Sequence, residues 1–231
     1  MQARLISVKK IQMKINTLII MMTDAYKHQS FYKEKENIRL LDCRDIEGTK
    51  CYLDDIAKKE LMLRISKEPA SNVHFIDSGN YHYISLLWLS LIKEDFNLVL
   101  FDHHPDDQAP SFGSITSCGG WVLEAKETLP HLKNVYTYGV GDEIPIANIP
   151  QNLPLYISID KDVLSTKYCI SDWDQGNMTL EELDNSLITL LQNHTILGVD
   201  ICGDSGELAE SAFEINSQTN LNIFDILSSN L

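Results

Sequence analysis

The sequence predicts an α/β fold, a three-layer α/β/α sandwich around a mainly parallel sheet. Two observations lead to this prediction. Short apolar runs alternate with segments of helical period, as they do where strands are joined by crossover helices. The runs are also apolar throughout, which is typical of strands that helices cover on both faces. With 231 residues, 44% of them hydrophobic, the chain is long enough for one such domain and short for two.

The apolar runs and periodic segments define the expected elements. The predicted strands are 17–22, 38–42, 73–77, 98–102, 135–140, 154–159 and 195–201. The predicted helices are 53–66, 81–93, 120–129, 180–191 and 223–229. Thr179 precedes Leu180-Glu181-Glu182, which is close to a capping box and marks a helix start. We expect a single domain over 14–231 and an N-terminal extension over 1–13.

Composition excludes several classes of protein. The formal net charge is −14, from 33 acidic and 19 basic residues, and there is no basic cluster that would bind nucleic acid. The apolar run at 18–22 is too short to span a membrane, so no membrane partner is expected. The five cysteines form no Cys-X-X-Cys pair. Reduced, mostly buried thiols in a cytoplasmic protein are therefore expected, without a disulfide framework or a thiolate zinc site.

Ionisable residues follow two of the predicted strands. The run at 98–101 is followed by Asp102-His103-His104-Pro105-Asp106, and the run at 155–159 is followed by Asp160-Lys161-Asp162. Parallel α/β sheets bind ligands at the carboxyl ends of their strands. Because alternate residues of an extended chain point the same way, the acids at 160 and 162 should converge, with the lysine between them pointing away.

A third strand end supplies a further imidazole. The run at 73–77 leads into Ser78-Gly79-Asn80-Tyr81-His82. A helix N-terminal role is the structural alternative for His82, as turn formation is for Asp102 and Asp106. Neither alternative explains why three strand ends together supply four carboxylates and two imidazoles. Oxygen and nitrogen ligands without thiolate suit Mn²⁺ or a similar divalent ion, and six ligands can serve two ions.

The motifs Asp-X-His-X-Asp and Ser-X-Asp-X-Asp, preceded by a Gly-rich turn that ends in histidine, resemble those of the arginase/agmatinase (ureohydrolase) superfamily. The resemblance covers about residues 73–204 and implies an arginase/deacetylase-like fold with two Mn²⁺ ions per chain. It implies that one ion is surrounded by His82, Asp102, Asp106 and Asp160. His104 and Asp162 would complete the second site, with Asp102 and Asp160 shared between the ions.

The resemblance implies a metal-dependent hydrolase that uses a metal-bridging hydroxide to cleave a non-peptide C–N bond of a small amidine, guanidine or amide. Asp106 would serve as the general acid and base. His103 has two open interpretations: a catalytic proton shuttle, or a residue that fixes a ligand carboxylate. The superfamily also implies trimers or hexamers, so a homo-oligomer is expected.

The sequence departs from the arginases around the substrate. Gly203 stands where arginases carry the glutamate that pairs with the guanidinium, and Asp204 and Glu207 are the nearest substitutes. Two loops, 105–118 and 165–178, should form the rim of the site, and Tyr168 and Trp173 in the second loop are candidate substrate contacts.

Two alternative functions remain open at this point. One is a deacetylase-like amidohydrolase with a single zinc ion. The other is a non-catalytic metal-binding domain, since the motif after Asp162 lacks the usual Asp-Pro pair and has Ser165-Thr166 instead. Metal content separates a two-ion from a one-ion centre, and turnover of any substrate excludes the non-catalytic domain.

Overall fold

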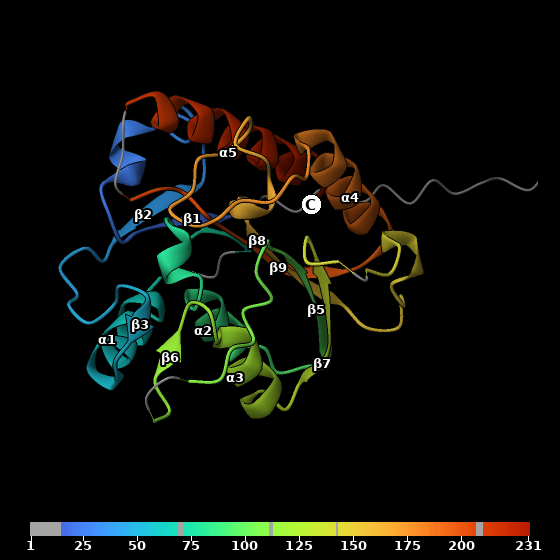
Figure 1. The fold of residues 1–231 in the computed structure, drawn as a ribbon, viewed down its shortest axis with the longest axis horizontal. Coiled ribbons are helices and arrows are strands. Elements are labelled where there is room, and N and C mark those ends of the chain that lie inside the picture. Colours follow the sequence, from blue (N-terminus) through green and yellow to red (C-terminus); the bar gives the residue numbers. More distant parts are fainter. Residues whose placement is uncertain (1–14, 69–71, 111–112, 142, 207–209) are drawn as a thin grey trace, which may run out of the picture.

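The computed structural model describes residues 15–68, 72–110, 113–141, 143–206 and 210–231 (Figure 1). The predicted N-terminal extension, 1–13, lies outside the described residues. Among the described helices, none is both long and apolar enough to cross a membrane.

The centre of the structure is a seven-stranded sheet in the order β2-β1-β4-β9-β8-β5-β7, with every neighbouring pair parallel. This confirms the predicted fold class, and each predicted strand corresponds to one strand of the sheet. The strands are β1 Thr17–Met21, β2 Ile38–Asp42, β4 Val73–Phe75, β5 Phe96–Phe101, β7 Leu132–Tyr138, β8 Leu155–Asp160 and β9 Ile196–Cys202.

Helices cover both faces of this sheet (Figure 1). One face carries α1 (Asp55–Ile65), α2 (Ile84–Leu89) and α3 (Trp121–Thr128), and the other carries α4 (Leu180–Asn193) and α5 (Glu210–Asn230). Short 3-10 helices lie in the connections: η1 Ala25–His28, η2 Gly79–Tyr81, η3 Ile146–Asn148 and η4 Lys161–Val163.

Each face of the sheet has its own hydrophobic core. On β1, Ile19 packs with residues of α4 and α5, whereas its neighbour Leu18 packs with residues of α1, α2 and α3. On β5, Val99 and Leu98 divide in the same way. Because successive side chains of a strand point to opposite faces, both sets must be apolar, which explains the uninterrupted apolar runs.

The differences from the predicted elements have local causes. Strand β4 ends at Phe75, before Asp77, whose backbone has φ +77 and whose carboxylate accepts the N–H groups of Met22 and Thr23. Helix α5 begins earlier than the predicted 223–229. The prediction was too short because the earlier turns contain buried polar residues, which interrupt the apolar pattern. Asn216, for example, bonds to the backbone of Ile170 in the loop before α4.

A small antiparallel pair, β3 (Tyr52–Leu53) and β6 (Thr116–Ser117), was not predicted. Two residues per strand are too few to show a period. At the start of α4, the capping box is present as predicted: Thr179 Oγ1 accepts the N–H of Glu182, and the Glu182 carboxylate accepts the N–H of Thr179.

Candidate metal centre

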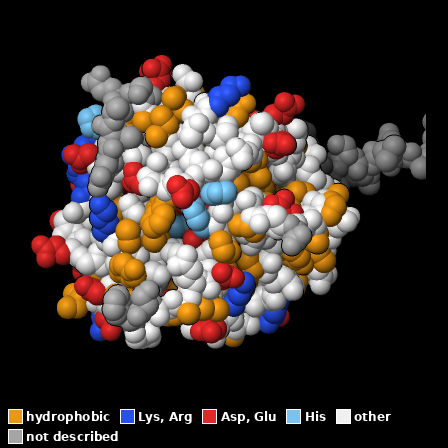
Figure 2. Space-filling model, viewed as in Figure 1, with side chains coloured by type: hydrophobic (Ala, Val, Ile, Leu, Met, Phe, Trp, Pro, Cys, Tyr) orange, Lys and Arg blue, Asp and Glu red, His pale blue; other side chains and the backbone are white. Residues whose placement is uncertain are grey.

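The predicted ligands come from the carboxyl ends of three strands, β4, β8 and β5, and β9 lies between β4 and β8 in the sheet. Asp102 directly follows β5, Asp160 is the last residue of β8, and His82 follows the 3-10 helix η2 after β4. Figure 2 shows histidine and acidic side chains together near the middle of this face of the molecule. The parallel topology therefore brings together residues that lie up to 80 positions apart in the sequence, as predicted.

The first group of ligand atoms surrounds the His82 imidazole. Its Nδ1 lies 3.1 Å from Asp106 Oδ2, 3.2 Å from Asp102 Oδ2 and 3.6 Å from Asp160 Oδ2. Its other nitrogen, Nε2, lies 2.8 Å from Ser158 Oγ. This hydrogen bond fixes the ring so that Nδ1 faces the three carboxylates, all of which are buried.

The second group consists of Asp102, His104 and Asp162. His104 Nδ1 lies 2.9 Å from Asp162 Oδ2 and 3.7 Å from Asp102 Oδ1. Asp102 thus turns Oδ1 toward the second group and Oδ2 toward His82, which is the arrangement of a bridging carboxylate. Asp160 differs, because its Oδ1 accepts the backbone N–H of Asp162 at 3.0 Å. The sharing of Asp160 stays a prediction.

Asp106 is positioned by its backbone and by an indole. Its φ of +47° lies in the left-handed region, which is uncommon for a residue with a side chain. Trp121 Nε1 donates a hydrogen bond to Asp106 Oδ2 at 2.7 Å. Sequence reasoning treats Trp121 as core, and it is fully buried, but its N–H also orients a predicted ligand. Nothing in the sequence separates this tryptophan from an ordinary core residue.

Two orphaned polar atoms indicate that the site fits a divalent cation. His82 Nδ1 and Asp102 Oδ2 are buried and have no hydrogen-bond partner in the described structure. Buried polar atoms are nearly always satisfied, so such a pair at the centre of a carboxylate cluster calls for a ligand. A cation between them would satisfy both, with the nitrogen and oxygen donors that Zn²⁺, Mn²⁺ and similar ions accept.

The electrostatics of the cluster agree with this interpretation. Burial, together with repulsion from Asp162 and Asp102, raises the pKa of Asp160 well above its ordinary value. Burial and the neighbouring Asp102 raise the pKa of Asp106 to about 7. Contacts with Asp102 and Asp162 raise the pKa of His104 to about 10. Without a cation, the cluster therefore retains protons at neutral pH.

A cavity of about 120 Å³ lies over the two groups. Five of the six predicted metal ligands line it, and the sixth, His82, is buried outside the lining. Trp173, a candidate substrate contact, also lines the cavity, and its Nε1 donates to Asn80 Oδ1 at 3.1 Å. The remaining lining residues are uncharged: Cys51, Tyr52, Gly79, Gln108, Ala109, Ser117, Cys118 and Gly119.

No protein-family model matches the sequence. An uncharacterized protein of Thermotoga maritima is 32% identical over 168 residues, which is 67% of this chain and 67% of that protein. The chain belongs to one family with it.

Several solved structures share this fold. They include an arginase from Bacillus caldovelox (TM-score 0.66, 13% identity, 92% of this chain and 98% of that chain). The agmatine ureohydrolase of Thermoplasma volcanium is similar (TM-score 0.66, 13% identity, 95% and 90%). So is the proclavaminate amidinohydrolase of Streptomyces clavuligerus (TM-score 0.65, 13% identity, 95% and 94%). The chain has the arginase/ureohydrolase fold.

Within this arginase/ureohydrolase fold, Gly203 permits no side chain. Its φ is +87°, and a Cβ atom built on it would lie 2.2 Å from Asp160 Oδ1 and 2.5 Å from the backbone nitrogen of Lys161. In arginases the resemblance aligns this position with the glutamate that pairs with the guanidinium. Here the space for a side chain is filled by the Asp160 carboxylate and the Lys161 backbone. Position 203 therefore cannot supply a carboxylate that binds the substrate.

Asp204 does not reach the cavity, contrary to expectation. It is fully buried, and its carboxylate bonds to Lys161 Nζ at 2.6 Å, Gln29 Nε2 at 2.7 Å and Asn220 Nδ2 at 3.2 Å. Since Lys161 is also fully buried, it needs this carboxylate as its counter-ion. Asp204, just after β9, therefore connects Lys161 at the end of β8 with Asn220 of α5. The other substitute, Glu207, lies outside the described residues.

Two further predicted residues also lie away from the cavity lining. Tyr168 packs against the core beneath α4 and α5, and its hydroxyl is 3.2 Å from Lys167 Nζ. His103 donates its backbone N–H to Asp162 Oδ1 at 3.0 Å, while its imidazole is not part of the lining. Because this contact comes from the backbone, both interpretations of the His103 imidazole stay predictions.

Replacing the bridging carboxylate should empty both ion sites. We expect Asp102→Asn protein to retain less than one ion per chain, because each ion loses a ligand, whereas His104→Ala should retain the ion held by His82. Elemental analysis after dialysis measures both. Asp200→Asn is the matched control, since Asp200 is a buried aspartate of β9 that bonds to His74 and Tyr156, outside both groups. Full metal content in Asp102→Asn protein would contradict the bridging assignment.

Metal uptake should release protons. Because the pKa of Asp106 is raised to about 7 and that of His104 to about 10, both side chains carry protons near pH 6.5 when no metal is bound. A cation that binds to them must displace these protons. We expect a drop in pH when Zn²⁺ or Mn²⁺ is added to weakly buffered protein near pH 6.5, and metal affinity should fall as the pH is lowered. An indicator dye follows the release. Uptake of metal at pH 6.5 without proton release would show that these pKa shifts are absent.

Proposed function

We propose that the protein is a metal-dependent hydrolase with two divalent ions that cleaves a non-peptide C–N bond of a small molecule. The observation that carries this proposal is the pair of ligand groups that meet at Asp102, with unpartnered buried atoms facing the space between the donors. The arginase/ureohydrolase fold, whose solved members include an arginase, an agmatine ureohydrolase and an amidinohydrolase by title, supports it.

The chemistry follows from the ligands and from Asp106. His82, Asp102, Asp106 and Asp160 would hold one ion, and Asp102, His104 and Asp162 the other. When bound, such a pair lowers the pKa of a water molecule from 15.7 to about 7 and polarises a carbonyl-like carbon for attack. Asp106 lines the cavity, and the Trp121 N–H holds its Oδ2. Its carboxylate would take the proton of the attacking water and deliver it to the departing nitrogen.

The cavity lining favours a substrate with an uncharged reacting group. Among the described lining residues, every carboxylate belongs to the predicted metal ligands, and the others are uncharged or are His104. A guanidinium or amidinium head would thus lack a free counter-ion, since Gly203 has no side chain and Asp204 is bonded to Lys161. We therefore favour an amide-like or neutral amidine substrate. Its small reacting group would be held by Gln108, Ser117 and Trp173.

Arginine should be a poor substrate. A buried guanidinium without a carboxylate partner costs about 3 kcal/mol, which corresponds to about 100-fold in kcat/KM. We expect a screen of simple amides, formamidines and guanidines with metal-loaded protein to find turnover outside the guanidines. Efficient conversion of arginine to ornithine and urea would contradict this proposal and would direct attention to Glu207.

Trp173 supplies the matched test for the cavity. Trp173→Phe should change the ratio of kcat/KM between two accepted substrates while metal content stays the same, because Trp173 lines the cavity and is not a ligand. Tyr168→Phe is the control from the same loop and should leave the ratio unchanged, since Tyr168 packs against the core. If both variants shifted the ratio equally, the loop would act through its stability and not through contact with the substrate.

A further inference from the structure

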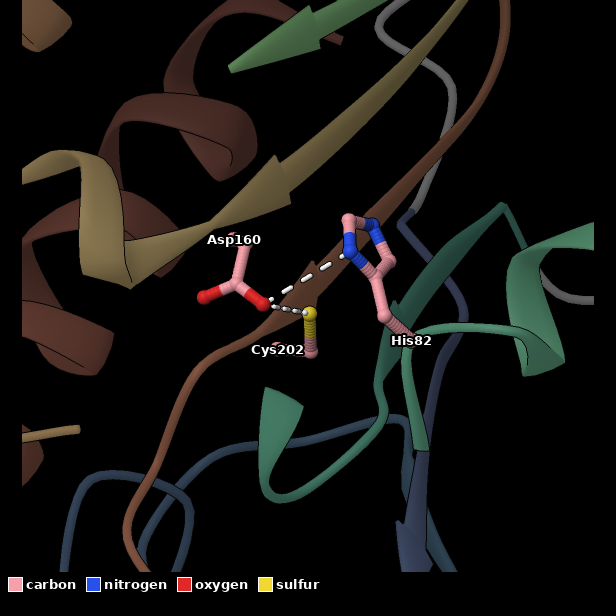
Figure 3. Close-up of side chains that lie close together, drawn as sticks. All are labelled: His82, Asp160 and Cys202. Carbon is pink, nitrogen blue, oxygen red and sulfur yellow. Dashed lines mark hydrogen bonds and ion pairs between the residues drawn. The ribbon is translucent and has the colours of Figure 1, made fainter. Parts of the chain in front are cut away.

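A cysteine lies beside the first group of predicted ligands. Cys202 is the last residue of β9, and its Sγ is 3.2 Å from Asp160 Oδ2. Figure 3 shows the Cys202 thiol, the Asp160 carboxylate and the His82 imidazole converging from three elements. The ligand atoms of these three residues all lie within 4.8 Å of one another, and all three residues are buried.

From this geometry we propose that Cys202 is a thiolate ligand of the ion held by His82, so that this ion is a softer metal such as Zn²⁺, Fe²⁺ or Co²⁺ and not Mn²⁺. The inference rests on the proposed two-ion centre and specifies one of its sites. Binding needs no oxidant: the S–H proton leaves to solvent, and the sulfur donates a lone pair to the cation.

An independent observation supports a ligand at this position. His82 Nδ1 is buried, has no hydrogen-bond partner in the described structure, and faces the Asp160 oxygen that the sulfur also approaches. A cation bound to Nδ1 and to that oxygen would therefore lie within reach of the thiol. Ser158 holds Nε2, so the imidazole cannot turn its other nitrogen away from the cluster without losing this bond.

The strand geometry directs this thiol to the cluster. Successive residues Ile201 and Cys202 belong to opposite faces of the sheet, Ile201 to the core under α4 and α5 and Cys202 to the core of α1, α2 and α3. Gly203 then turns the chain in the left-handed region, which allows the Asp160 carboxylate to lie against it. The thiol consequently lies at the end of β9, level with the end of β8.

The two ion sites would then differ in their chemistry. Thiolate favours Zn²⁺ and other soft or borderline ions, while carboxylates and water suit Mn²⁺. The second group, Asp102, His104 and Asp162, contains no cysteine. We therefore expect a centre with one thiolate-bound ion and one ion bound by oxygen and nitrogen alone. This replaces the expectation, drawn from the sequence, of a ligand set without thiolate.

Substitution with Co²⁺ tests the ligand directly, on the full chain. Bound Co²⁺ has visible ligand-field absorption whatever its ligands, whereas a Co²⁺–thiolate bond adds intense charge-transfer absorption in the near ultraviolet. We expect both signals from the wild-type protein. Cys202→Ser and Cys202→Val should keep the ligand-field bands and lose the charge-transfer band, and valine preserves the apolar packing if serine destabilises the fold. In Cys202→Val, the preference for Zn²⁺ over Mn²⁺ should fall on the order of 10-fold or more.

Cys169→Ser is the matched control. Cys169 is as buried as Cys202, but its Sγ donates to the Gly203 carbonyl at 3.4 Å and is not part of the ligand groups. Cys169→Ser protein should therefore keep the charge-transfer band. Co²⁺ binding without this band in the wild type, or a band that survives in Cys202→Val, would overturn the inference and leave the two-ion centre standing: Cys202 would then be a neutral hydrogen-bond donor to Asp160. Failure to bind Co²⁺ at all would instead overturn the proposed function.

Discussion

Four aspartates gathered at one edge of the sheet impose the main constraint on this structure. Their oxygens fall within 4.8 Å of neighbouring ligand atoms, in a site with little access to water. Two like charges at such a distance repel by about 3 kcal/mol at an effective dielectric constant near 20. The cluster can relieve that repulsion by retaining protons or by binding cations. Cations are favoured because His82 Nδ1 and Asp102 Oδ2 are buried at the centre of the cluster and have no hydrogen-bond partner in the described structure.

The scaffold holds these donors in place from several sides. Ser158 orients His82, Trp121 orients Asp106, and the backbone of His103 and His104 donates to Asp162 and Asp102. These four of the six predicted ligands are therefore held by a neighbouring residue, as is usual around metal sites. Beneath the site, Lys161 and Asp204 form a buried pair with Asn220 of α5, which connects the site to the helical layer.

The sequence was sufficient to predict the fold class and to pick out the acidic and histidine residues that the structure gathers at the strand ends. Strand runs, their parallel order and the alternation of residues are local properties, and they place Asp102, His104 and Asp162 on one edge. What local patterns could not give was the partner of each side chain. Asp204 was expected to face a substrate, but its carboxylate bonds to Lys161, which follows β8, and to Asn220 of α5. The roles of Trp121 and Cys202 likewise depend on contacts with residues more than ten positions away.

The backbone around Gly203 fills the position that the resemblance assigns to a charged pocket residue. Apart from the predicted metal ligands, the described cavity lining is uncharged. The proposed metal chemistry would thus act on a different reacting group. This separation explains why the metal motifs are clear in the sequence while the substrate contacts are not.

Anomalous diffraction from crystals of the metal-loaded protein would locate the ions. We expect two peaks about 3.5–4 Å apart on either side of the Asp102 carboxylate, one beside His82 Nδ1 and one beside His104 Nδ1. A single peak, or peaks elsewhere in the molecule while the space between these side chains contains only water, would contradict the proposed two-ion centre.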